Sequence, residues 1–256
     1  MTNLENQNRK VTVGSIPFEV ASVSDAAAQL LQSASSGAGT SVRLSNAYCV
    51  ALASSDKSYL QILQGPGVNY PDGSPIAWFM RRKDKSAQQV RGPSLFNEAL
   101  RQSSSHGTKH FFLGSSPETL KLLQKRVEER FPNTRIAGTY SPPFQPLGAD
   151  LYDACANAVA EVDADLIWVA LGTPKQDFVA HELTQRTGKT TVAVGAAFDF
   201  TAGTVREAPE WTRRFGMEWA FRLIVEPRRL WKRYLIGNVQ FLLAVLRPKE
   251  PNVHVR

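Results

Sequence analysis

The sequence predicts an α/β protein with a mostly parallel sheet covered by helices on both faces. Apolar, strand-like runs alternate with amphipathic segments of helical length over the first two hundred residues, and this order is typical of parallel sheets. The runs lack polar alternation, which indicates strands buried on both faces. The length of 256 residues and the 43% hydrophobic content suit one large domain, or one domain with an appendage.

The expected strands share a high content of β-branched and aromatic residues. The first of them, residues 11–20, is predicted to be a hairpin. The remaining strands are expected at residues 41–44, 67–70, 109–114, 134–140, 165–172 and 190–198.

Amphipathic segments between these strands predict the helices, at residues 22–35, 47–55, 94–104, 116–131, 151–162 and 175–187. Ser116 followed by Pro117 fits an N-cap and a first helical residue. Thr173 and Gln176 have the spacing of a capping box, so helix capping alone could explain both residues.

The positive charge of the chain is concentrated near its end. Eight basic and two acidic residues lie from Arg213 to Arg247, so six of the seven net charges fall within 35 residues. Prolines 209, 227 and 248 divide this region into short helices. We therefore expect a core over residues 1–205 and a helical, basic appendage over residues 206–256. The appendage either binds an anionic membrane surface or only docks on the sheet with its arginines in solvent.

Other features limit the classes of protein. The N-terminus has no apolar signal-peptide core, and the longest uncharged apolar stretch near the end, 234–246, is too short to span a bilayer. These features predict a cytoplasmic protein, peripheral to the membrane. Two distant cysteines, Cys49 and Cys155, are expected to be buried free thiols, and the histidines lack zinc-ligand spacing. No GxGxxG or GxxxxGK[ST] motif is present, which disfavours a dehydrogenase or a P-loop nucleotidase.

The candidate site residues follow strands, where ligands of open parallel sheets bind. Asp72 in PDG could simply form a turn, and Asp199 could order a loop. With Asn46 after the second strand and Lys175 at a helix start, however, they could form one cleft for a diphosphate-activated donor. A carboxylate base there could deprotonate an acceptor hydroxyl while cations stabilise the departing diphosphate.

Three blocks of the chain resemble the WecG/TagA/CpsF family of bacterial glycosyltransferases, and the resemblance runs from about Val11 to about Leu246. The blocks are NAYCVALASSDKSYLQILQGPGVNYPDGSPIAW, VALGTPKQDF and VGAAFDFTAGTVREAPEWTRRFGMEWAFRLIVEPRRLWKRYLIGN. The resemblance implies a Rossmann-like core with a membrane-associating appendage. It also implies inverting transfer, without metal or other cofactor, from a UDP-sugar to a polyprenyl-diphosphate-linked glycan in teichoic acid, common antigen or exopolysaccharide synthesis. The donors implied are UDP-N-acetylmannosamine, its uronic acid and UDP-glucuronic acid.

The resemblance also implies roles for individual residues. Asp72 corresponds to the aspartate taken as the catalytic base, and Asn46 to the asparagine of a TxN element. Gln176 corresponds to a substrate-binding glutamine. Arginines of the last block are implied to fold over the donor diphosphate, and these are Arg222, Arg229 and Lys232 or Arg233. At helical spacing Arg222, Arg229 and Arg233 would share a face if Pro227 did not interrupt the helix.

The chain departs from the family pattern at two places, and both concern the choice of donor sugar. Leu44 stands where the family commonly has threonine, with Ser45 as the nearest hydroxyl. Arg91 directly precedes Gly92, whereas the family commonly places arginine earlier, at the position of Gln89. Arg91 is therefore included among the expected substrate-binding residues.

One alternative to an enzyme remains open from sequence, and a second is disfavoured. A non-catalytic membrane-surface protein could bind a nucleotide sugar within a polysaccharide assembly complex without needing Asp72. Nucleic-acid binding through the basic segment is not expected, because no recognition motif is present. The sequence leaves homo-oligomerisation open.

Overall fold

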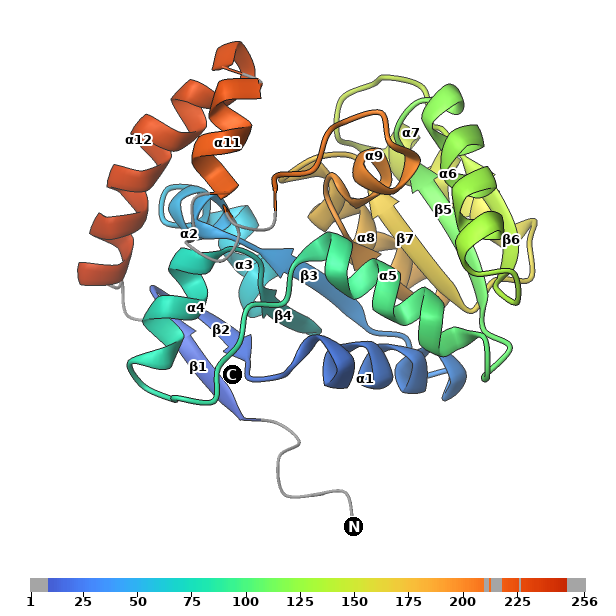
Figure 1. Cartoon of the computed structure of the whole chain (residues 1–256), viewed down its shortest axis with the longest axis horizontal. Helices are drawn as coiled ribbons and strands as arrows, with labels where there is room; N and C mark the ends of the chain where they lie inside the picture. Colours follow the sequence, from blue (N-terminus) through green and yellow to red (C-terminus); the bar gives the residue numbers. More distant parts are fainter. Residues whose placement is uncertain (1–8, 210–211, 213–217, 226, 248–256) are drawn as a thin grey trace.

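The computed structural model of the chain describes residues 9–209, 212, 218–225 and 227–247. A six-stranded sheet runs through the molecule with helices on both faces, and two C-terminal helices, α11 (Glu218–Val225) and α12 (Pro227–Leu246), stand at one side (Figure 1). This architecture confirms the α/β class and the Rossmann-like parallel sheet expected from the sequence.

All six strands of the main sheet run parallel. Their order across the sheet is β4 (Val68–Pro71), β3 (Ser41–Ser45), β8 (Thr190–Ala193), β7 (Leu166–Ala170), β5 (Lys109–Gly114) and β6 (Arg135–Tyr140). Every residue of β3, β7 and β8 is buried. The absence of polar alternation in these strands therefore reflects cover on both faces.

One face of the sheet carries a core rich in aromatic rings. The ring of Phe96 lies edge-on to that of Trp168, with 4.8 Å between centroids, and 5.7 Å from that of Phe198. Such edge-on and tilted contacts are favourable arrangements of aromatic quadrupoles. The helices over this face are α1 (Val23–Ser35), α5 (Gly92–Ser103), α6 (Pro117–Arg130) and α9 (Ala197–Ala202).

The opposite face is covered by α7 (Ala149–Ala160) and α8 (Lys175–Thr187), which pack against β5 and β7. Cys155 lies in this second cluster and Cys49 in a third, and both are buried free thiols, as expected.

The third cluster lies beside the sheet, around an N-terminal hairpin. Strands β1 (Lys10–Val13) and β2 (Ile16–Glu19) pair antiparallel, which confirms the expected hairpin. Gly14 in the turn has φ of 63°, a conformation that glycine adopts without steric cost. The hairpin packs against α2 (Ala47–Ala53), α3 (Lys57–Gln64) and α4 (Ser74–Arg81).

The expected strand over residues 190–198 was too long. Strand β8 ends at Ala193, and residues 197–202 form α9. Gly195 has φ of 61°, which ends the extended backbone immediately after β8. Ala197, Phe198 and Ala202 of α9 are buried, so composition alone did not separate this helix from a buried strand.

The C-terminal segment forms α11 (Glu218–Val225) and α12 (Pro227–Leu246), which lie side by side (Figure 1). Because α12 begins at Pro227, Arg222 lies in a different helix from Arg229 and Arg233, and the single helical face considered for all three is wrong. Helix α12 packs along α2. Phe241 of α12 is buried, and its ring lies 5.6 Å from the ring of Phe79 in α4. Among the described helices, none has the length and apolar composition needed to cross a bilayer.

Candidate active site at the carboxyl edge of the sheet

Asn46 and Asp72 lie side by side at the carboxyl edge of the sheet. Strands β3 and β4 are parallel neighbours, and Ser45 pairs with Pro71 at their carboxyl ends. Asn46 and Asp72 are the residues that follow this pair. The backbone N–H of Asp72 donates to the carbonyl oxygen of Ser45 at 3.0 Å. The two residues expected in one cleft therefore begin from neighbouring points of this edge.

The two side chains are held by different local structures. Asn46 caps α2: its Oδ1 accepts from the backbone N–H groups of Tyr48, at 3.0 Å, and Cys49, at 3.4 Å. Asp72 lies in the turn between β4 and α4, where Gly73 has φ of 116° and lies against Asn46. Asp72 is thus a turn residue, and its half-buried side chain also lies where ligands of parallel sheets bind.

Gln176 lies in the first turn of α8, next to the end of β8. Its Oε1 accepts from the backbone N–H of Gly195 at 3.1 Å, and its side chain is buried. The capping-box interpretation of Thr173 and Gln176 is wrong, because Pro174 is the N-cap and makes no side-chain capping bond. The Gln176 amide instead connects the first turn of α8 to the segment after β8.

Lys175 reaches a neighbouring loop. Its Nζ donates to the carbonyl oxygen of Gln145 at 2.5 Å and lies 5.6 Å from the ring centroid of Phe144. This cation therefore lies beside the loop that follows β6.

Asp199 and Ser115 lie at the far side of the edge, after β8 and β5. Ser115 Oγ donates to Asp199 Oδ1 at 3.4 Å. The carbonyl oxygen of Asp199 accepts from the N–H groups of Thr204 and Val205, so Asp199 also orders the segment after α9. Ser115 was not singled out from sequence, yet its φ of 61° is unusual for a residue with a side chain, and such strain concentrates at functional sites.

Arg91 joins the core to the segment that leads to the appendage. Its Nη2 lies 3.0 Å from Glu207 Oε1, and its side chain is only 10% exposed. The preceding residue, Val90, donates its N–H to the carbonyl oxygen of Pro71 at 2.9 Å. Arg91 therefore lies beside the end of β4, where Pro71 precedes Asp72, and holds the chain after α9 there.

Four residues expected to bind the diphosphate lie in the C-terminal helices: Arg222 in α11, and Arg229, Lys232 and Arg233 in α12. Their side chains lie outside the described part of the structure. The backbone of α12 nevertheless shows where the three residues of this helix lie along α2, because Gly237 packs against Tyr48 in the first turn of α2. The earlier turns of α12 therefore extend past the N-terminus of α2, toward the carboxyl edge of the sheet (Figure 1).

A buried charged network lies beneath the site. Tyr59 donates its hydroxyl to Asp177 Oδ2 at 2.8 Å, and Arg43 donates to Asn69 Oδ1 at 2.9 Å. Burial lowers the pKa of the Arg43 guanidinium to about 10, and the negative charge of Asp177 partly counteracts this decrease. Burial also raises the pKa of Tyr59 well above its usual value, and the Cys49 and Asp177 side chains add to this effect. Because Asp177 directly follows Gln176, this network fixes the helix turn that carries the glutamine.

The departure from the family pattern in β3, at Leu44, gives no side chain exposed in the site. Leu44 packs in the aromatic core, and Ser45 is fully buried. As for metals, the described residues hold no cluster of three or more His, Cys, Asp or Glu side chains able to ligate an ion.

The carboxyl edge of the sheet contains a topological switch point between β5 and β7. The chain leaves β5 for α6 on one face and leaves the adjacent β7 for α8 on the other, so a crevice is expected between these strand ends. From β4 to β5 the edge spans four inter-strand steps, or roughly 19 Å. One extended ligand could therefore reach from Asp72 to Ser115.

Comparison with known proteins identifies the class. The chain matches the model of the glycosyl transferase WecG/TagA/CpsF family over residues 11–253. It therefore belongs to this family and is a glycosyltransferase. It is similar to N-acetylglucosaminyldiphosphoundecaprenol N-acetyl-beta-D-mannosaminyltransferases of Bacillus subtilis (strain 168) and Bacillus spizizenii (strain ATCC 23059 / NRRL B-14472 / W23). Identity to the first is 28% over 76% of this chain and 74% of the relative. Identity to the second is 29% over 74% and 72%.

Proposed function

We propose that this enzyme transfers a sugar from a UDP-sugar to a sugar carried on a polyprenyl diphosphate, in the synthesis of a cell-surface polymer. The observation that carries the proposal is the adjacency of Asp72 and Asn46 at the carboxyl edge, one strand away from the Gln176–Gly195 pair. The names of the two relatives support a lipid-linked acceptor and N-acetylmannosamine as the transferred sugar. The uronic acid of N-acetylmannosamine and glucuronic acid are the other candidate sugars.

In the proposed reaction, Asp72 takes the proton from an acceptor hydroxyl as that oxygen attacks the anomeric carbon of the donor. The new carbon–oxygen bond forms on the face opposite the leaving group, and the bond to the UDP oxygen breaks with its electron pair going to UDP. The anomeric configuration is thereby inverted. Asn46 and Gln176 position the sugars, and Arg222, Arg229, Lys232 and Arg233 offset the charge that develops on the diphosphate. No metal is needed for this scheme.

We further propose that the enzyme acts while bound to the inner face of the cytoplasmic membrane. Helices α11 and α12 expose apolar side chains, among them Ile224 at 79%, Val239 at 59% and Leu246 at 73% exposure. Exposed apolar side chains beside many basic residues suit an anionic lipid surface. The lipid-linked acceptor is confined to such a surface.

The transfer assay combines the purified enzyme with N-acetylglucosaminyl diphosphate on a short prenyl chain and with a panel of UDP-sugars. We expect UDP release and a lipid product heavier by one sugar. Asp72→Asn should lower kcat by roughly 10²- to 10⁴-fold, which is the usual contribution of a general base. Asp150→Asn, at an exposed position in the first turn of α7, is the matched control. Full activity of a folded Asp72→Asn variant would exclude Asp72 as the base.

A further inference from the structure

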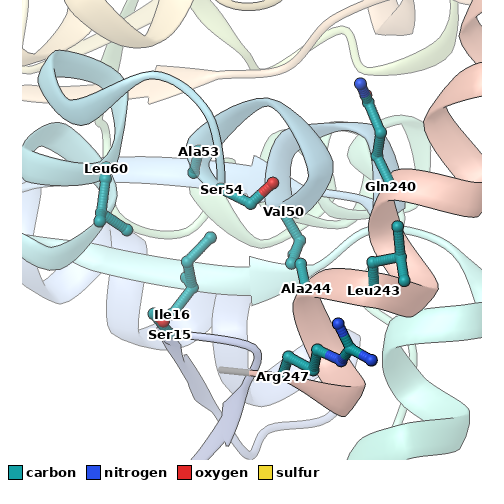
Figure 2. A pocket seen from close by; sticks show the side chains of 10 residues that line it. All are labelled: Ser15, Ile16, Val50, Ala53, Ser54, Leu60, Gln240, Leu243, Ala244 and Arg247. Carbon is teal, nitrogen blue, oxygen red and sulfur yellow. The ribbon is translucent and has the colours of Figure 1, made fainter. Parts of the chain in front are cut away.

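A cavity of about 250 Å³ lies between α12 and the group formed by the hairpin, α2 and α3 (Figure 2). Most of its lining side chains are apolar, and these are Ile16, Val50, Ala53, Leu60, Leu243 and Ala244. Ser54 also lines the cavity, but its hydroxyl donates to the carbonyl oxygen of Ala51 at 2.6 Å. The lining therefore favours a hydrocarbon group over a polar one.

The cavity can hold a ligand of substantial size. An apolar cavity of about 150 Å³ in another protein takes a benzene ring. By this comparison 250 Å³ has room for roughly ten carbon atoms. Burying that many carbons removes enough apolar surface from water to strengthen substrate binding by more than roughly tenfold.

The cavity begins close to the proposed active site. Helix α2 starts after Asn46, and at 1.5 Å per residue Val50 lies roughly 6 Å, and Ser54 roughly 12 Å, farther along its axis. Helix α12 runs along α2 in the same sense, with Gly237 at Tyr48 and the cavity-lining residues in its following turns. A ligand that leaves the site along α12 therefore meets the cavity after about one helical turn.

The cavity is also continuous with the exposed apolar face of α12. Leu243 lines the cavity and is still 52% exposed. Gln240 and Arg247 lie at opposite ends of the labelled lining in Figure 2, with Leu243 between them. A hydrocarbon chain could thus pass from a lipid surface over Leu243 into the cavity.

We infer that this cavity binds the isoprenoid carbons nearest the diphosphate of the lipid-linked acceptor. The inference rests on the proposed function, since it concerns the same acceptor. Helix α12 carries four basic residues in its first two turns, before the part that packs on α2, and lines an apolar cavity farther on. This order matches a diphosphate followed by an isoprenoid chain. The cavity thereby selects acceptors by their lipid as well as by their sugar.

The test compares two acceptors in detergent, N-acetylglucosaminyl diphosphate esterified either to farnesol or to methanol. The wild type should have a KM at least roughly tenfold lower for the farnesyl compound. Leu243→Trp, which fills the cavity from α12, and Ala53→Leu, which fills it from α2, should remove most of this preference and leave the KM for the methyl compound unchanged. Leu242→Trp is the matched control, because Leu242 is 48% exposed on the same helix and does not line the cavity.

A direct binding measurement separates this inference from the proposed function. Titration of the full chain with dansylated farnesyl diphosphate should give a Kd that rises several-fold in Leu243→Trp and Ala53→Leu and stays unchanged in Leu242→Trp. Retained farnesyl preference and binding in both folded filling variants would overturn the inference, as would an equal loss in Leu242→Trp. Absence of transfer to either acceptor by the wild type would refute the proposed acceptor, and the titration would still decide whether the cavity binds prenyl chains.

Discussion

The backbone N–H of Gly195 donates to Oε1 of Gln176 at 3.1 Å, which joins the end of β8 to the first turn of α8. The bond orients the Gln176 side chain at the carboxyl edge, one strand from Asn46. Because Gly195 has φ of 61°, the chain turns there into α9, which carries Asp199. One side-chain hydrogen bond thus ties together two segments of the candidate site.

Replacement of Gln176 by methionine should reduce both stability and activity. The change keeps side-chain volume but leaves the Gly195 N–H unpaired, at a cost of about 1–3 kcal/mol in unfolding free energy. We expect kcat/KM for sugar transfer to fall by roughly 10- to 100-fold, since the proposed substrate contacts of the amide are lost as well. The measurements are urea unfolding and the transfer assay, with exposed Gln124→Met on α6 as the control. Unchanged kcat/KM would show that Gln176 is purely structural.

The Tyr59–Asp177 bond should be important for folding stability. Tyr59→Phe removes one hydrogen bond to a buried carboxylate, and we expect a loss of about 1–3 kcal/mol. Asp177→Ala leaves the buried Arg43 without that negative charge, so a larger loss of about 3–5 kcal/mol is expected. Urea denaturation measures both values, and Tyr152→Phe, at a partly exposed tyrosine, is the control. Equal stability of Tyr59→Phe and wild type would contradict the assigned network.

Stability should fall as the pH decreases from about 6.5 toward 4, and His110 is one cause. Burial lowers the pKa of His110 to about 4, and Trp168 Nε1 donates to its Nδ1 at 2.9 Å. Below the unfolded pKa of about 6.5 the unfolded chain binds a proton that the folded protein excludes, so acidification favours unfolding. Between pH 7 and pH 5 this effect should cost about 2 kcal/mol of unfolding free energy.

The variant His110→Gln, which can still accept from Trp168, should reduce this pH dependence. Burial also lowers the pKa of His181, so part of the slope should remain. Urea unfolding at pH 7, 6 and 5 compares the variant with the wild type, and exposed His106→Gln serves as the control. Parallel stability curves for wild type and His110→Gln would exclude His110 as a cause.

Charge on the exposed face of α12 should weaken membrane binding. Val239→Glu and Leu246→Glu each replace an exposed apolar side chain with an anion, and we expect partitioning to anionic vesicles to fall by roughly tenfold or more. Leu122→Glu on α6, at a site 44% exposed, is the matched control. Sedimentation with phosphatidylglycerol vesicles measures the effect. Equal partitioning of all three variants would place the membrane contact elsewhere.

Local sequence signals predicted the features that depend on neighbouring residues. Ser116 caps α6 through Thr119 N–H, and Pro117 opens that helix, as expected. Asn46 and Asp72 could be placed at one edge because each directly follows a strand and the strands were expected to be parallel. Periodicity and capping rules are thus sufficient where a few adjacent residues determine the structure.

Features that depend on distant residues could not be predicted in this way. Tyr59 and Asp177 are 118 positions apart, and only the packing of α3 against α8 brings them together. The Gln176 amide could equally have capped α8, and its bond to Gly195 follows from the turn after β8. Gly195 was the one local signal for that turn, since glycine often marks a change to positive φ.

The strand order has a consequence for synthesis of the chain on the ribosome. Strand β8 lies between β3 and β7, so the pair β3–β4 and the group β5–β6–β7 have no direct strand contact with each other. Translation proceeds at about 5–20 residues per second. Nascent chains that end before Thr190 therefore hold two partial sheets, with the edges of β3 and β7 unpaired. Until the last strand emerges, these edges are available for wrong pairing, and this interval is when the protein most needs a chaperone.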